Sequence, residues 1–346
     1  MVDVKKITII KPDDWHVHFR SGKILQKMVK YTSQFYQRAM IMPNLKNPIT
    51  TIQSGEDYKK NIVNLLKKNS TFKPLITCYL TEDTKPNDIE YAFYKKVFFA
   101  AKLYFRNSTS YSKSGITNIN TINLVLDRMQ KIGMPLLIHG EILDKNVDIF
   151  DREKVFINTV LVKLQENFPQ LKIVLEHIST KDAVNFVKFS NNNIAATITP
   201  HHLLYNRNDM LRTGIKPHLY CFPILKSKIH QNALKKAITS GNKKFFLGTD
   251  SAPHYVHRKE SNCGSAGIFN TLSSLSIYIE IFEKMRALNH FESFCSKNGP
   301  LFYSLPENKS TITFIKRKWK IPKEIVIGRK KIIPFLAGKT MKWAIK

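Results

Sequence analysis

The sequence predicts an α/β fold, a single (β/α)8 barrel of the TIM type with a short C-terminal extension. Two patterns predict it: eight short apolar runs rich in Val, Ile, Leu and Phe recur along the chain, and longer amphipathic segments separate them. A chain of 346 residues with 43% hydrophobic residues can also bury one large barrel core. We expect the barrel to occupy residues 1–306 and a basic extension, packed on the barrel, to occupy residues 307–346.

The eight apolar runs are the expected strands. Each is short and is followed by polar or turn-forming residues, which is typical of buried parallel strands. In chain order they are the run that ends at residue 18, then 39–42, 75–80, 97–104, 136–138, 173–175, 194–199 and 245–247.

Amphipathic segments between and after the strands are the expected helices. In one of them, Ile119, Ile122, Leu126 and Met129 recur at steps of three and four residues, and Gly133 stands where a helix cap is expected. The expected helices are 54–68, 117–131, 152–167, 181–189, 226–239, 269–288 and 291–297.

A His-x-His pair lies at the end of the first expected strand. In a regular strand His16 and His18 project to one face, while Trp15, Val17 and Phe19 project to the other. Two imidazoles on one face can bind one metal ion. The pair alone fits two ordinary histidines on a half-buried strand better, so a metal site depends on residues further along the chain.

Ligand-type side chains follow four later strands as well. Because the carboxyl ends of barrel strands open on one face, we expect all of these side chains to lie together there. Imidazole and carboxylate groups favour zinc or a similar divalent metal. Taken alone, the aspartate in this set could equally cap the segment that follows it. The candidate ligands are His16, His18, Lys102, His139, His177 and Asp250.

Lys102 is the unusual member of this set, because an ammonium group repels cations. It can contribute only as a neutral amine, or after it has combined with carbon dioxide to form a carbamate that can bridge two metals. Its apolar strand favours the neutral, nucleophilic amine. The alternative is a buried lysine that pairs with an acid.

The composition argues against several other classes of protein. Lys and Arg number 55 against 26 Asp and Glu, a formal net charge of +29, but they form only short clusters without a basic arm. We therefore expect no specific nucleic-acid partner, although the positive field could attract an anionic substrate. The four cysteines form no Cys-x-x-Cys pair, the N-terminal residues lack the apolar core of a secretion signal, and no apolar run approaches the about 20 residues of a membrane helix. We expect a soluble, cytoplasmic protein that does not bind membranes.

The segments around the candidate ligands form a specific set of motifs that extends over nearly the whole chain. They lie at residues 12–20, 42–45, 101–104, 137–141, 176–178, 248–254, 263–267 and 334–338. Residues 12–20 read Pro-Asp-Asp-Trp-His-Val-His-Phe-Arg, and residues 248–254 read Gly-Thr-Asp-Ser-Ala-Pro-His. Together these motifs resemble the dihydroorotases of the bacterial homodimeric type (class II), within the amidohydrolase superfamily.

This resemblance implies a homodimer with two zinc ions in each subunit. His16, His18 and Asp250 would hold one ion, His139 and His177 would hold the other, and carboxylated Lys102 would bridge them. The implied reaction is the reversible closure of N-carbamoyl-L-aspartate to (S)-dihydroorotate with loss of water, the third step of pyrimidine biosynthesis. A hydroxide shared by the ions would be the nucleophile, and Asp250 would be the catalytic base and acid.

The substrate would carry a carboxylate, for which Arg20 offers a planar fork and Asn44 a neutral donor. The alternative for Arg20 is a surface ion pair. The resemblance further implies that the substrate contacts the backbone of two residues and that the loop 105–115 closes over the site as a lid. The implied substrate contacts are His18, Arg20, Asn44, His139, Phe222, His254 and Ala266, and the lid residues are Thr109 and Ser110.

Some positions depart from the family pattern. The lid usually carries two adjacent threonines, Phe105 stands where a proline is more usual, and Phe222 replaces a leucine. One alternative function is that of another cyclic-amide hydrolase, such as a hydantoinase or an allantoinase, which needs no carboxylate clamp. Outside enzymes, the alternative is a basic nucleic-acid-binding protein.

Overall fold

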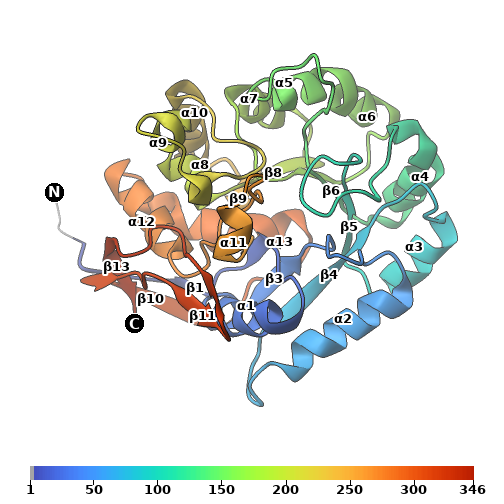
Figure 1. The fold of residues 1–346 in the computed structure, drawn as a ribbon. Coiled ribbons are helices and arrows are strands. Elements are labelled where there is room, and N and C mark those ends of the chain that lie inside the picture. The colour runs from blue at the N-terminus through green and yellow to red at the C-terminus, as the bar shows by residue number, and fades with distance from the viewer. Residues whose placement is uncertain (1–3) are drawn as a thin grey trace.

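Eight parallel strands form one sheet in the order of the chain, which confirms the predicted barrel. The computed structural model describes residues 4–346, so the first three residues of the expected barrel lie outside the described part. Figure 1 shows the strands around the centre of the molecule and the helices around them. The strands are β2 (Asp14–Val17), β3 (Arg38–Ile41), β4 (Lys73–Tyr79), β5 (Ala100–Leu103), β6 (Leu136–Ile138), β7 (Ile173–Leu175), β8 (Ile194–Ile198) and β9 (Phe245–Leu247).

The barrel closes next to β2 and β9, the first and last strands of the sheet. A parallel bridge joins Val17 to Ser251, and the His18 N–H donates to the Ser251 carbonyl over 3.0 Å. The Asp250 N–H donates to the His16 carbonyl over 2.8 Å. Below this closing seam, Asp14 accepts hydrogen bonds from both the N–H and the hydroxyl of Thr249. The seam therefore lies next to three of the candidate ligands.

Strand β2 is irregular, and this overturns the strict alternation predicted from the sequence. The pairing of β2 with β3 shifts register between Asp14 and Val17, as a β-bulge does. As a result, Trp15 packs in the barrel interior with inward-facing residues of other strands, whereas Val17 and Phe19 belong to the outer core under the helices. Because of the bulge, the side chains of the adjacent residues Trp15 and His16 both point into the barrel.

Most predicted helices are present, with changed ends. The predicted helix 152–167 contains one π-helical turn, and 117–131 begins as a 3-10 turn. The predicted helix 269–288 is shorter because Asn270 binds the Ser251 hydroxyl and the Thr249 carbonyl instead of joining the helix. The helices are α1 (Gly22–Phe35), α2 (Ile52–Asn64), α3 (Pro86–Tyr94), α4 (Asn123–Ile132), α5 (Arg152–Phe156), α6 (Val162–Asn167), α7 (Lys181–Phe189), α8 (Pro200–Leu204), α9 (Arg207–Leu211), α10 (Lys228–Thr239), α11 (Val256–Lys259), α12 (Ser274–Lys284) and α13 (Asn298–Phe302).

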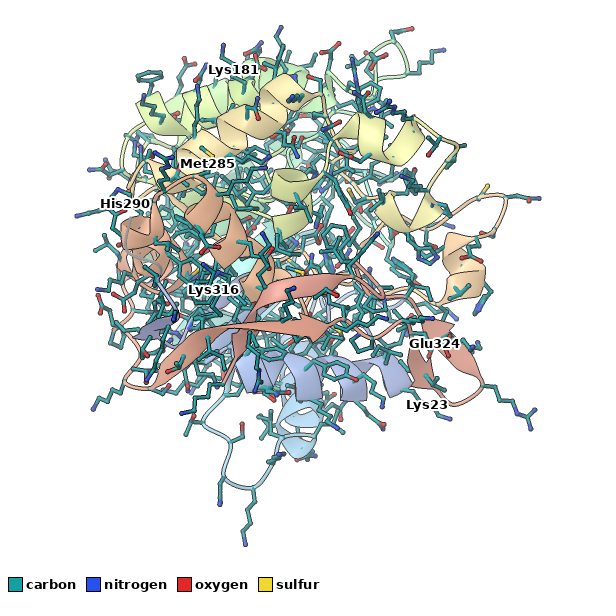
Figure 2. All side chains as sticks on the ribbon, turned by 90° about the vertical axis from the view of Figure 1, so that its left-hand side faces the viewer. Lys23, Lys181, Met285, His290, Lys316 and Glu324 are labelled. Carbon is teal, nitrogen blue, oxygen red and sulfur yellow. The ribbon has the colours of Figure 1, made fainter. Side chains whose placement is uncertain are left out.

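The C-terminal segment forms a small antiparallel sheet together with a strand from the other end of the chain. Strand β10 (Thr311–Lys320) lies between β1 (Lys6–Ile10) and β13 (Thr340–Ile345). Strands β11 (Ile325–Ile327) and β12 (Lys330–Ile332) form a separate pair. Figure 1 shows the sheet at the side of the barrel, and Figure 2 faces it, with Lys316 of β10 labelled. The division at residue 306 stays a prediction, since β1 ties the start of the chain to this sheet.

Trp343 of β13 anchors the sheet to the barrel. Its side chain is fully buried, its indole N–H donates to Glu283 of α12, and its carbonyl accepts from the Ser276 hydroxyl of the same helix. Within residues 4–346, none of the helices combines the length and apolarity that a membrane crossing requires.

Candidate metal centre and active site

The carboxyl ends of the barrel strands surround one narrow cavity. It brings together the predicted site residues except Lys102 and His254, which contact neighbouring groups instead. Residues from both ends of the sequence thus meet at one point, as the barrel topology requires. The predicted residues that line the cavity are His16, His18, Arg20, Asn44, Thr109, Ser110, His139, His177, Phe222, Asp250 and Ala266.

His16, His18 and Asp250 form the first group of possible ligands, with ligand atoms all within 4.8 Å of one another. The Asp250 carboxylate lies 3.0 Å from His18 Nε2 and 3.4 Å from His16 Nε2. His16 Nδ1 lies 2.8 Å from a Glu176 carboxyl oxygen, so this contact engages Nδ1 and leaves Nε2 on the side of Asp250. Burial lowers the pKa of His18 to about 4 and keeps the pKa of His16 well below its usual value. Both rings are therefore neutral and can bind a cation.

His139 and His177 form a second group. His139 Nε2 lies 2.9 Å from the Glu141 carboxylate, which leaves His139 Nδ1 free to face His177 Nε2 at 3.3 Å. Burial keeps the pKa of His177 well below its usual value. The pair brings two imidazole nitrogens close enough together to bind one cation. His177 and Asp250 both have positive φ, 42° and 44°, a strained conformation typical of functional sites.

Lys102, on β5, lies near both groups of side chains, since its charge helps to lower the pKa of His16, His18 and His177. Its side chain is fully buried, and its amine forms no hydrogen bond within residues 4–346. Nζ lies 5.1 Å from the centre of the Tyr104 ring. Burial lowers the pKa of Lys102 to about 8, against the opposing effect of the Glu176 and Asp250 carboxylates. A buried ammonium without a hydrogen-bond partner is costly, so the site fits a neutral or chemically modified amine better.

Two glutamates contact the candidate histidine ligands, and the sequence analysis assigned no role to either of them. Glu141 fixes the His139 ring, and Glu176 fixes the His16 ring while it accepts from the Thr197 hydroxyl over 2.5 Å. Carboxylates of this kind set the tautomer of a metal-binding histidine and raise its basicity. Their positions in the sequence could have indicated this role, since Glu141 follows His139 by two residues and Glu176 directly precedes His177.

A second histidine cluster lies in the connection 200–225. His201, His202 and Cys221 bring three possible ligand atoms together. Both nitrogens of His202 are already engaged, one 2.7 Å from the Thr199 hydroxyl and the other 2.8 Å from the Pro223 carbonyl. This cluster is therefore a hydrogen-bonded network that supports the cavity wall next to Phe222.

Arg20 lines the same cavity as the histidines His139 and His177. Its Nη2 lies 3.0 Å from His254 Nε2, and its Nη1 is buried without a hydrogen bond within residues 4–346. The open Nη1 can bind an anionic ligand. His254 contacts Arg20 rather than lining the cavity, and the Asn44 amide donates to the Ser110 carbonyl of the loop over 3.1 Å. Direct contact of His254 or Asn44 with a ligand stays a prediction.

The loop 105–115 lies over the cavity. The Ser110 hydroxyl donates to the Ala266 carbonyl over 3.4 Å, and the Arg20 guanidinium lies 5.8 Å from the centre of the Tyr111 ring. The loop is stabilised internally, because Ser112 exchanges hydrogen bonds with Thr109. The structure thus places the loop at the cavity, and its action as a lid stays a prediction.

The barrel and the site at its carboxyl end define the class of the protein. The sequence profile described as the amidohydrolase family matches residues 7–324. The chain is also similar to the dihydroorotase of Buchnera aphidicola subsp. Acyrthosiphon pisum, with 55% identity over 99% of this chain and 98% of that one. It therefore belongs to the dihydroorotases of the amidohydrolase family.

Solved structures agree with this assignment. The crystal structure of dihydroorotase from Saccharomyces cerevisiae in complex with 5-fluoroorotic acid superimposes with a TM-score of 0.92, at 30% identity and 99% coverage of both chains. An L-hydantoinase from Arthrobacter aurescens superimposes with a TM-score of 0.81 at 15% identity, over 98% of this chain and 83% of that one. At that identity the hydantoinase shows a shared fold only.

Proposed function

We propose that this chain catalyses the reversible closure of N-carbamoyl-L-aspartate to (S)-dihydroorotate with loss of water. The main support is that metal-type ligands and the open Nη1 of Arg20 face the same cavity. The metal-type ligands suit chemistry at a ring amide, and Arg20 Nη1 suits the carboxylate that the substrate carries. We also propose that the protein is a cytoplasmic homodimer.

The residues fit two zinc ions. His16, His18 and Asp250 would hold one ion, His139 and His177 would hold the other, and carboxylated Lys102 would bridge both. Support comes from the buried His16 Nε2 and Lys102 Nζ, which have no hydrogen-bond partner within residues 4–346. When bound, zinc would polarise the amide carbonyl and lower the pKa of water to about 7.

Asp250 is the proposed proton carrier. It is 5% exposed, its backbone N–H donates to the His16 carbonyl, and its carboxylate lies 3.0 Å from His18 Nε2. During hydrolysis the Asp250 carboxylate would take a proton from the attacking water and give it to the departing ring nitrogen. During ring closure it would take the proton from the attacking nitrogen, so one group is base in one direction and acid in the other.

Arg20 is the proposed anchor for the substrate carboxylate. Its Nη1 is open, and its other nitrogens are held by His254 and, through Nε, by the Pro253 carbonyl at 3.4 Å. This fixes the plane of the guanidinium before a ligand binds, which lowers the entropic cost of binding. His254 would then act by orienting Arg20.

Turnover by the wild-type protein tests this proposal. The zinc-loaded protein is expected to open the dihydroorotate ring, which ultraviolet absorbance can measure. It should leave hydantoin, which has no carboxylate, almost unchanged. Arg20→Met should reduce this preference, because it removes the only proposed anchor that carries a charge. Rapid hydrolysis of hydantoin with no reaction of dihydroorotate would favour the hydantoinase alternative instead.

Tyr111 is expected to hold the lid closed over Arg20. The ring is 43% exposed, and a cation–π contact at such a site contributes about 0.5–1 kcal/mol. Tyr111→Ala should therefore raise KM for dihydroorotate about two- to fivefold, measured by initial rates. Tyr111→Phe keeps the ring and is the matched control. Equal KM values for the two variants would contradict this role.

A further inference from the structure

Lys259 is a buried cation next to the active-site cavity. It is the last residue of α11, and its side chain is almost fully buried. Its ammonium group donates to three backbone carbonyls, those of Tyr220 at 2.8 Å, Ser265 at 2.9 Å and Gly267 at 2.8 Å. An ammonium has three N–H donors, so the three carbonyls satisfy it completely.

These carbonyls belong to two segments that are distant in the sequence and adjacent in space. One segment runs from residue 220 to 222, and the other from 265 to 267. The Gly267 N–H donates to the Tyr220 carbonyl over 2.9 Å, so the two segments are in direct contact. Lys259 binds both segments at this contact. Both segments then line the cavity, through Phe222 on one side and Ala266 with Gly267 on the other.

The hydrogen bond from Lys259 to the Ser265 carbonyl also determines the direction of the Ala266 N–H. In a planar trans peptide the C=O of one residue and the N–H of the next point in opposite directions. Because the Ser265 carbonyl points to Lys259, the Ala266 N–H points away from it. This N–H forms no hydrogen bond within residues 4–346, although Ala266 is buried and lines the cavity. A buried N–H without a partner is costly, so it is suited to bind a ligand.

We propose that Lys259 is a positioning residue. It orients the Ala266 N–H and fixes the adjoining segment 220–222, so that backbone groups of both segments lie where they can bind the edge of the substrate ring. This inference rests on the proposed function, since it takes the dihydroorotate ring as the ligand. A charged donor is suited to the task, because charge-assisted hydrogen bonds to three carbonyls restrain both segments at once. Lys259 contacts no candidate metal ligand through these bonds, so its effect is on ligand binding rather than on the reacting groups.

Lys259→Met tests the proposal, because it removes the ammonium and keeps an unbranched side chain. With 5-fluoroorotate as the probe and zinc-loaded protein, calorimetry is expected to show Kd raised about tenfold. KM for dihydroorotate should rise by a similar factor while kcat stays within about threefold, the pattern of lost binding in both ground and transition states. The zinc content should not change.

Arg258→Met is the matched control, since it removes an exposed cation from the neighbouring position of the same short helix. We expect it to leave Kd and KM unchanged. A folded Lys259→Met protein with wild-type Kd and KM would overturn the proposal, even if its melting temperature were lower, because Lys259 would then serve the fold alone.

A third variant covers the case in which Lys259→Met does not fold. Lys259→Gln keeps an amide with two donors, and we expect it to weaken 5-fluoroorotate binding by a smaller factor; an unchanged Kd would overturn the proposal. Wild-type protein that binds the probe but does not turn over dihydroorotate would contradict the proposed function instead. The two failures are therefore distinguishable.

Discussion

Lys102→Ala is expected to lower kcat for dihydroorotate by at least about a thousandfold, because the metal contribution to such reactions amounts to several kcal/mol. The variant removes the side chain that is proposed to bridge the two groups of histidines. We expect it to retain less than the wild-type amount of zinc, measured by atomic emission. In the wild type, mass spectrometry under native conditions should find one added carbon dioxide per chain, and the variant should lack it.

A matched lysine at the other end of the barrel controls for this change. Lys172 lies directly before β7, and its amine binds the Phe302 carbonyl and the Ser304 hydroxyl. Lys172→Ala should keep its zinc, its added carbon dioxide and its kcat. Addition of a short carboxylic acid to Lys102→Ala should restore part of the activity, because it can replace the missing carbamate. A Lys102→Ala protein with wild-type zinc and kcat would show that Lys102 has no part in the centre.

Asp250→Asn is expected to lower kcat by about 10² to 10⁴, the range for loss of a general base or acid. Asparagine keeps the size and shape of the side chain but can no longer accept a proton at neutral pH. Because Arg20 and Ala266 are untouched, Kd for 5-fluoroorotate should stay within about threefold of the wild-type value. Calorimetry and initial rates measure the two quantities separately. A kcat close to wild type would exclude Asp250 as the proton carrier, and a large rise in Kd would assign it to ligand binding.

The eight strands of the barrel could be predicted because each is a short apolar run, and longer amphipathic segments separate the runs. The same feature placed His139, His177 and Asp250 at one face, since parallel strands all end on the same side. The start of the fourth strand was wrong: the N–H groups of Val97 and Phe98 bind back to Ala92 at the end of α3, so the strand begins only at Ala100. Local composition does not distinguish a helix end from a strand start when both are apolar.

Features that depend on distant partners could not be predicted. Strand β1 pairs with residues 311–315, and nothing within its own five residues indicates that partner. Helices α1 and α3 were not predicted, although Pro86 at the start of α3 is a recognisable signal. The bulge that moves Trp15 inward depends on pairing with β3. Lys259 stands in a run of charged residues that reads as a solvated surface, and only the folded chain shows that three carbonyls surround it.

The closing seam of the barrel has a consequence for how the protein acquires its metal. His16 and His18 come from the first strand of the barrel, and Asp250 follows the last, so the complete set exists only when β9 has docked beside β2. A growing chain that still lacks residue 250 would expose imidazoles without the carboxylate. Because a cation that binds only the closed form stabilises it by mass action, chelation should make this joint the first part of the barrel to exchange its amide hydrogens.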